Sequence, residues 1–91
     1  MDNNCIFKIN EKIILENVGD ECVLLDLESG KFFTLNATGQ KIIELIKSNI
    51  NLGEMIKILS DNNEQEVKRD LTSFLDDLNG RGFIEVSYKG T

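Results

Sequence analysis

The sequence predicts an α+β fold in which a three-stranded antiparallel sheet is followed by three α-helices. Three short apolar runs separated by turns occupy the first part of the chain, as in a β-meander. At Asn36 the hydrophobic period changes from two toward 3.6, which marks the start of helical structure. Two later asparagines, Asn51 and Asn63, each precede a glutamate by three positions, a spacing typical of helix starts.

The three strands are expected at residues 12–16, 21–27 and 31–35. Turns at residues 17–20 and at Ser29-Gly30 join them, and Gly30 can take the positive φ that a short hairpin loop with a bulge requires. Because connections this short favour antiparallel pairing of neighbours, the first and third strands should form the edges of the sheet.

The first two predicted helices follow one another over residues 36–59, and the polar stretch at residues 60–63 ends the second. Asn36 should cap the first helix, which is expected to end near residues 48–49. Its apolar face is formed by Ile42, Ile43, Leu45 and Ile46. Asn51 and Glu54 have the spacing of a capping box, so a second, shorter helix is expected over residues 52–59.

The third predicted helix begins at Asn63, which has the same capping relation to Glu66, and ends at Gly80 or Gly82. Its spacing of apolar residues is that of a helix with one buried face. The inward residues are Val67, Leu71, Phe74, Leu75 and Leu78.

The remaining residues complete a single small unit. Phe83, Ile84 and Val86 predict a short strand or a packed extension, and residues 87–91 are polar enough to form a frayed tail. A chain of 91 residues, 41% of them hydrophobic, supports one core, so we expect a single domain over residues 1–91.

Charge and composition limit the function classes. A formal net charge of −6 argues against nucleic-acid binding, which depends largely on Lys and Arg displacing counterions. The N-terminus has neither a signal peptide nor a membrane span, so we expect a cytoplasmic protein with no membrane partner. Cys5 and Cys22 are too far apart for a paired-cysteine motif, and we interpret them as reduced thiols.

Residue types that support catalysis are sparse. The chain has no His, no glycine-rich phosphate loop and no nucleophile set beside a base. Adjacent acids such as Asp76 and Asp77 do not share a helix face, so they do not form a carboxylate pair. The sequence therefore predicts a binding protein that is not an enzyme and that needs no cofactor or metal.

Peptide binding uses features that the sequence does contain. An edge strand at residues 31–35 would display unpaired backbone groups that an extended peptide can satisfy. Alternation places Phe32 and Thr34 on one face of this strand and Phe33 and Leu35 on the other. Because two adjacent aromatics cannot face the same core, Phe32 is the best candidate for exposed peptide contact.

The third helix can supply the other wall of a groove for such a peptide, although a helix-spaced apolar stripe is also what ordinary core packing requires. Lys31, Lys68 and Arg69 are the bases best placed to meet acidic side chains of a ligand. The predicted peptide-binding residues are Lys31, Phe32, Phe33, Thr34, Leu35, Val67, Lys68, Leu71, Phe74 and Leu75.

The same segment carries a family resemblance. A hydrophobic strand and an acidic residue precede Ser29-Gly30-Lys31, then the paired aromatics Phe32-Phe33, then Leu35-Asn36-Ala37-Thr38-Gly39. This order resembles the PqqD-like family of small peptide-modification chaperones, also called precursor-peptide recognition elements. The resemblance runs from about Val18 to Val86, and it rests on the order and spacing of these features rather than on any one of them.

The resemblance implies a winged-helix-like fold and a partner. It implies that the chain binds the leader of a ribosomally synthesised precursor peptide and delivers the peptide to a modifying enzyme or leader protease. In the family, the leader adds as a strand to the third strand and lies against the third helix. On this sequence that relation implicates residues 31–35 and the exposed edge of residues 67–75.

Two alternatives stay open at this point. Three helices and a β wing also describe many DNA-binding regulators, but residues 64–79 carry five acids and two bases, a charge of −3 where phosphate contacts would need the opposite sign. The other alternative is a structural subunit, such as a homodimer, that uses the edge strand at residues 31–35 to assemble with itself.

Overall fold

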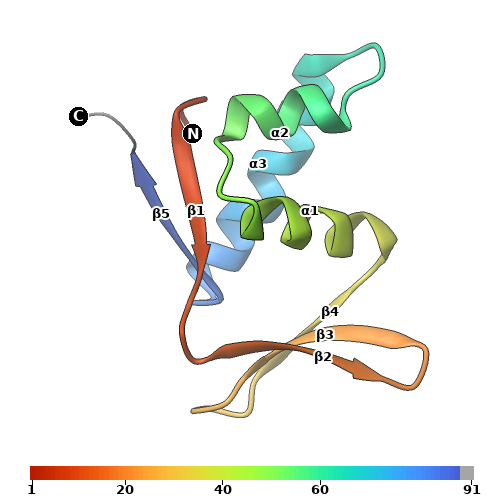
Figure 1. Ribbon diagram of the computed structural model, residues 1–91, viewed down its shortest axis with the longest axis vertical. Helices are drawn as coiled ribbons and strands as arrows, with labels where there is room; N and C mark the ends of the chain where they lie inside the picture. The colour runs from red at the N-terminus through yellow and green to blue at the C-terminus, as the bar shows by residue number, and fades with distance from the viewer. Residues whose placement is uncertain (89–91) are drawn as a thin grey trace.

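The computed structural model describes residues 1–88 of the 91-residue chain, and these form eight elements in an α+β arrangement (Figure 1). In chain order they are β1 (Cys5–Ile9), β2 (Ile13–Val18), β3 (Glu21–Asp26), β4 (Phe32–Leu35), α1 (Ala37–Lys47), α2 (Leu52–Leu59), α3 (Glu64–Gly80) and β5 (Ile84–Tyr88). The predicted fold class is confirmed, since the antiparallel sheet β2-β3-β4 is followed by three helices.

The three-stranded sheet has the predicted order, with β3 in the centre and β2 and β4 at its edges. Leu24 on β3 lies directly opposite Leu15 on β2 and Phe33 on β4, so these side chains share the face that turns toward the helices. Gly30 has a φ of 78°, and the N–H of Gly30 donates to the Asp26 carbonyl at 2.8 Å. The expected glycine-dependent hairpin turn is therefore present.

The turn between β2 and β3 is shorter than the predicted residues 17–20. Asn17 and Val18 pair with Cys22 and Glu21, so the ladder continues almost to the tip of the hairpin. Gly19 makes this possible because its φ of 63° suits the first position of a two-residue loop. The predicted boundary was wrong because Asn17 and Val18 were assigned to the turn, whereas they belong to the β2–β3 ladder.

All three helices begin at the predicted caps. The Asn36 side chain accepts a hydrogen bond from the Gly39 N–H at 2.7 Å, which starts α1. Asn51 and Glu54 form a complete capping box at the start of α2. The Asn63 side chain accepts from the Glu66 N–H at 3.1 Å and so starts α3.

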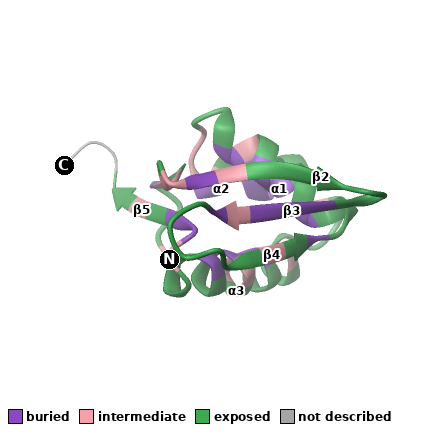
Figure 2. Cartoon of the chain, turned by 90° about the horizontal axis from the view of Figure 1, so that it is seen from below, coloured by how far each residue is buried: buried purple, intermediate pink, exposed green. Residues whose placement is uncertain are grey.

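The core is one apolar cluster to which both sheets and all three helices contribute. Leu24 of β3, Ile43 of α1, Met55 of α2 and Leu75 of α3 have no exposed surface. The helices thus lie together over one face of the β2-β3-β4 sheet, whose other face is seen in Figure 2.

A second, two-stranded sheet joins the two ends of the described chain and was only half predicted. The short strand expected around Phe83, Ile84 and Val86 is present as β5, but its partner β1 was not predicted. Cys5 and Phe7 of β1 are buried in the core. The prediction of a frayed tail is wrong for Ser87 and Tyr88, because they pair with β1, and its remainder lies outside the described residues.

Within the part of the chain that the structure describes, Cys5 and Cys22 are buried free thiols, and no three potential ligands gather as a metal site. None of the described helices has the length and apolar character that crossing a bilayer requires.

Candidate peptide-binding site

The free edge of β4 is defined by one hydrogen bond. The Asp26 N–H donates to the Lys31 carbonyl at 2.8 Å, so Lys31 directs its carbonyl toward β3. In an antiparallel ladder this direction alternates along the strand. Phe33 and Leu35 therefore also pair with β3, whereas the N–H and C=O groups of Phe32 and Thr34 point to the edge where the described residues place no further strand.

On the inner side of β4, Phe33 packs against α3. Its ring lies edge-on to Phe74, with the centroids 6.0 Å apart, and to Phe83 at 6.1 Å. The Arg81 guanidinium lies 5.6 Å from the Phe33 centroid, and its Nε also contacts Asp77 Oδ1 at 2.8 Å. Phe33 is half-buried, so these contacts hold α3 alongside the strand and leave part of the ring exposed.

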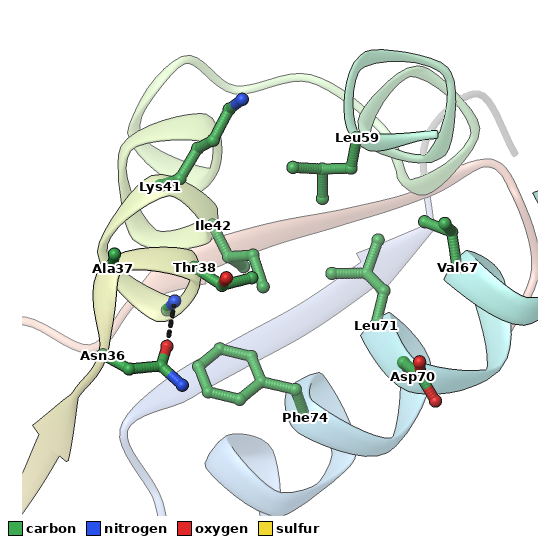
Figure 3. A pocket seen from close by; sticks show the side chains of 11 residues that line it. Asn36, Ala37, Thr38, Lys41, Ile42, Leu59, Val67, Asp70, Leu71 and Phe74 are labelled. Atoms are coloured by element: carbon green, nitrogen blue, oxygen red, sulfur yellow. Dashed lines mark hydrogen bonds between the residues drawn. The ribbon is translucent and has the colours of Figure 1, made fainter. Parts of the chain in front are cut away.

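A cavity of about 550 Å³ opens where β4 runs into α1 (Figure 3). Apolar side chains from three helices point into it, namely Ile42, Leu59, Val67, Leu71 and Phe74. Figure 3 shows the Lys41 ammonium and the Asp70 carboxylate pointing away from this apolar interior. The cavity therefore has an apolar interior and a charged rim, as sites for apolar ligand groups usually have.

Gly39 explains how α1 comes so close to its neighbours. A Cβ at this position would lie 3.2 Å from Leu35 Cδ2 and 3.5 Å from Phe74 Cζ. The absence of a side chain thus lets the first turn of α1 contact both β4 and α3 at the end of the cavity.

A second hollow, of about 650 Å³, lies at the other end of β4. It is lined by the turn residues Ser29 and Gly30, by Lys31 and Phe32, and by Gly80, Arg81 and Phe83 at the end of α3. We call the two hollows, with Phe33 and Phe74 between them, the β4–α3 groove. The groove runs beside the edge at which the backbone groups of Phe32 and Thr34 are free, and bases lie near both of its ends.

The structure brings together part of the predicted set. Phe33, Val67, Leu71 and Phe74 line the groove or contact its lining residues. Lys31 lies at the second hollow. Leu35 and Leu75 are 4% and 0% exposed, so they support the groove from within the core.

The other predicted contacts are less directly related to the groove. Phe32 lines the second hollow and its backbone is at the free edge, but its side chain is 66% exposed and lies on the sheet face opposite Phe33. Lys68 lines a polar hollow with Asn3 and Asn51, and Arg69 is at the solvent-exposed start of α3. Neither of these two bases is part of the groove.

Several groove residues were not predicted. The first hollow includes Asn36, Lys41, Ile42 and Leu59, and the second hollow includes Arg81 as a base beside the predicted Lys31. Helical periodicity showed that Ile42 and Leu59 face inward, but periodicity does not say which neighbouring helix an inward face meets. The spacing of Arg81 from Phe74, two helical turns, is the one signal that could have placed Arg81 beside the groove.

Comparison with known proteins agrees with this arrangement. The chain is similar to a solved structure described as "TbiB1 in Complex with the TbiA(beta) Leader Peptide", with a TM-score of 0.76 and 30% sequence identity over 86% of this chain and 94% of that one. A second solved structure, described as "Lasso peptide synthetase B1 complexed with the leader peptide", has a TM-score of 0.70 and 21% identity over 87% of this chain and 96% of that one. No curated protein gives a match.

The family assignment rests on a match that covers most of the chain. Residues 21–84 match the family described as Coenzyme PQQ synthesis protein D (PqqD). This segment contains β3, β4 and all three helices, and hence both walls of the β4–α3 groove. Because the match spans well over half of the 91 residues, this protein belongs to the PqqD family.

Proposed function

We propose that this protein is a single recognition domain that binds the leader of a ribosomally made precursor peptide and presents the peptide to a modifying enzyme or leader protease. The observation that carries this proposal is the free edge of β4, where the backbone groups of Phe32 and Thr34 lie directly beside an apolar groove. An added strand would satisfy those groups, and its alternate side chains would enter the groove.

The comparisons support the same function. TbiB1, with 30% identity to this chain, is described in complex with a leader peptide. Belonging to the PqqD family adds support, because the walls of the groove lie inside the matched segment. A binding role without turnover, cofactor or metal fits a site made of backbone groups and apolar side chains.

Binding a leader can accelerate a reaction that the protein does not itself catalyse. Backbone pairing supplies affinity that depends little on sequence, while the hollows at the two ends of β4 select side chains. Holding the leader beside the enzyme raises the effective concentration of the attached core peptide, so micromolar affinity is sufficient.

The test is a titration of the isotope-labelled protein with the leader of the precursor peptide encoded beside its gene, followed by amide NMR shifts. We expect saturable binding, with the largest shifts in residues 31–35 and 64–79, because both walls of the groove must respond. Duplex DNA is the control ligand, and shifts with DNA but none with the leader would favour a regulator. Dimerisation that shifts the same residues without any peptide would favour self-assembly through β4.

A further inference from the structure

The outer face of the three-stranded sheet carries an apolar row that ends at the free edge. Ile14 on β2 lies directly opposite Leu25 on β3, and Leu25 lies directly opposite Phe32 on β4. Figure 2 looks onto the sheet with the helices behind it. Ile14 and Leu25 are half-buried, whereas Phe32 is 66% exposed. Among the described strands, β4 has no neighbour on its other side.

The next row on the same face has a different chemistry. It runs from Glu16 through Val23 to Thr34, so it ends in a polar side chain at each edge. Edge strands of stable proteins usually carry polar or charged residues, because an exposed apolar edge invites association. On this face Phe32, and Val18 on the other edge strand at 58% exposed, depart from this tendency. A strand added to β4 would cover Phe32.

The backbone direction of Phe32 makes that contact unavoidable for an added strand. Its N–H and C=O groups point to the free edge, so a peptide that pairs with them places one of its own residues beside Phe32 on the outer face. Directly opposite side chains on neighbouring strands lie about 5 Å apart at Cβ and interact.

We propose that the leader is read on both faces of β4: its inward side chains enter the β4–α3 groove, and one outward side chain, aliphatic or aromatic, packs on Phe32 and extends the row from Ile14 and Leu25. This inference rests on the proposed function and adds a requirement to it. The outward leader position beside Thr34, two residues away, accepts a polar side chain.

The outward contact also fixes the register. Backbone pairing alone permits a peptide to slip along the edge, and a slip of one residue exchanges its two faces. A slip of two residues keeps the inward set inward but moves the apolar outward side chain from Phe32 to Thr34. Only the correct register therefore fills the groove and covers Phe32 together.

The test compares Phe32→Lys with Leu27→Lys by fluorescence anisotropy with the labelled leader of the precursor encoded beside the gene. Leu27 is a matched control because it is 62% exposed, close to the 66% of Phe32, but lies away from the free edge of β4. It is in the turn that follows β3, where its N–H donates to the carbonyl of Lys12, just before β2. Each leader residue is also replaced in turn by Asp. We expect Phe32→Lys to raise the Kd about fivefold and Leu27→Lys to leave it within about twofold.

The peptide series identifies the position that contacts Phe32. At one outward position, replacement by Asp should weaken binding of the leader to the unmodified protein about fivefold. For the Phe32→Lys protein the order should reverse, with this Asp peptide binding more tightly than the unmodified leader. Equal effects of the two Lys variants, or an Asp series in which only groove-facing positions matter, would overturn the outward contact and leave the proposed function intact. Failure of the unmodified leader to bind the unmodified protein would overturn both.

Discussion

At the scale of single residues, Thr34 offers the sharpest test of strand addition. Its N–H points away from β3, so replacing it with Pro removes a group that the β3–β4 ladder does not use. We expect Thr34→Pro to raise the Kd for the leader about tenfold, through one lost hydrogen bond and the obstruction of its neighbours by the ring. Isothermal titration calorimetry measures this change.

The matched control is Thr34→Val, which keeps the N–H and the β-branched shape and should bind within about twofold of the unmodified protein. Urea unfolding establishes that both variants are folded. A folded Thr34→Pro protein with normal affinity would show that the peptide does not pair with this edge.

Asp26, at the end of β3 and before the turn into β4, makes the stability of the fold depend on pH. Burial raises the pKa of Asp26, but hydrogen bonds from the Glu28 and Ser29 N–H groups and the Ser29 hydroxyl, together with the charge of Lys12, outweigh burial, so the pKa lies below its ordinary value. A carboxyl with a lowered folded-state pKa stabilises the fold above its unfolded-state pKa of about 3.9 and loses that effect as the pH falls through the folded-state value.

We therefore expect Asp26→Asn to be less stable than the unmodified protein at pH 7, with a difference that shrinks in acid. The amide oxygen of Asn can still accept from the Glu28 and Ser29 N–H groups, so the variant isolates the charge. Urea unfolding at pH 7, 5 and 3 measures the difference. A gap that stays constant down to pH 3 would contradict the lowered pKa.

At the scale of elements, the role of α3 as a wall of the groove can be tested by introducing one charged side chain on it. Val67 is half-buried and lines the first hollow, so Val67→Glu places a carboxylate on an apolar surface that the leader must cover. We expect the Kd for the leader to rise about tenfold, measured by anisotropy. Gln65→Glu is the matched control, because it adds the same charge near the start of α3 outside the groove; equal effects of the two variants would indicate general repulsion.

The start of α1 combines a stability role with a place in the groove. Asn36 caps α1 and lines the first hollow, whereas Asn63 caps α3 without lining the groove. Replacing either by Ala should lower the free energy of unfolding by about 1 kcal/mol in urea titrations. Only Asn36→Ala should also weaken leader binding, and equal affinities of the two variants would remove Asn36 from the site.

Elements defined by local signals could be predicted from the sequence, and those defined by distant partners could not. The three asparagine caps and the glycine of the β3–β4 turn act within a few residues, so their spacing located the helices and the hairpin. The strand β1 was missed because its partner strand is β5, at the other end of the described chain, and its other bridge, from Ile6, is to the distant Asn51. A strand of five residues has no local cap or turn signal that reveals such a partner.

The candidate site divides in the same way. Alternation along β4 correctly separated Phe32 from Phe33, because the two faces of a strand follow from its geometry. The contribution of Ile42 and Leu59 to the groove depends on how α1 and α2 pack around α3, which the periodicity of each helix leaves open. Leu75 was included because it shares a helical stripe with Leu71, yet full burial makes it part of the core.

At the scale of the whole molecule, the β1–β5 sheet ties both ends of the described chain to the core. Phe7 of β1 is 2% exposed and packs within the same cluster as the helices. Phe83, which precedes β5, contacts Phe33 at the floor of the groove. Folding of this sheet and shaping of the groove should therefore be parts of one cooperative unit.

Phe7→Ala tests that coupling. We expect the free energy of unfolding to fall by about 3 kcal/mol or more, because a buried aromatic ring is replaced by a cavity, whereas Lys8→Ala, at an exposed position of the same strand, should change it by less than about 0.5 kcal/mol. Because the leader binds only the folded state, adding it at 100 times its Kd should restore about 2.7 kcal/mol. Urea unfolding with and without peptide measures both effects. A small loss for Phe7→Ala would place β1 outside the cooperative core, and a large loss that the leader does not offset would show that leader binding requires an intact β1–β5 sheet.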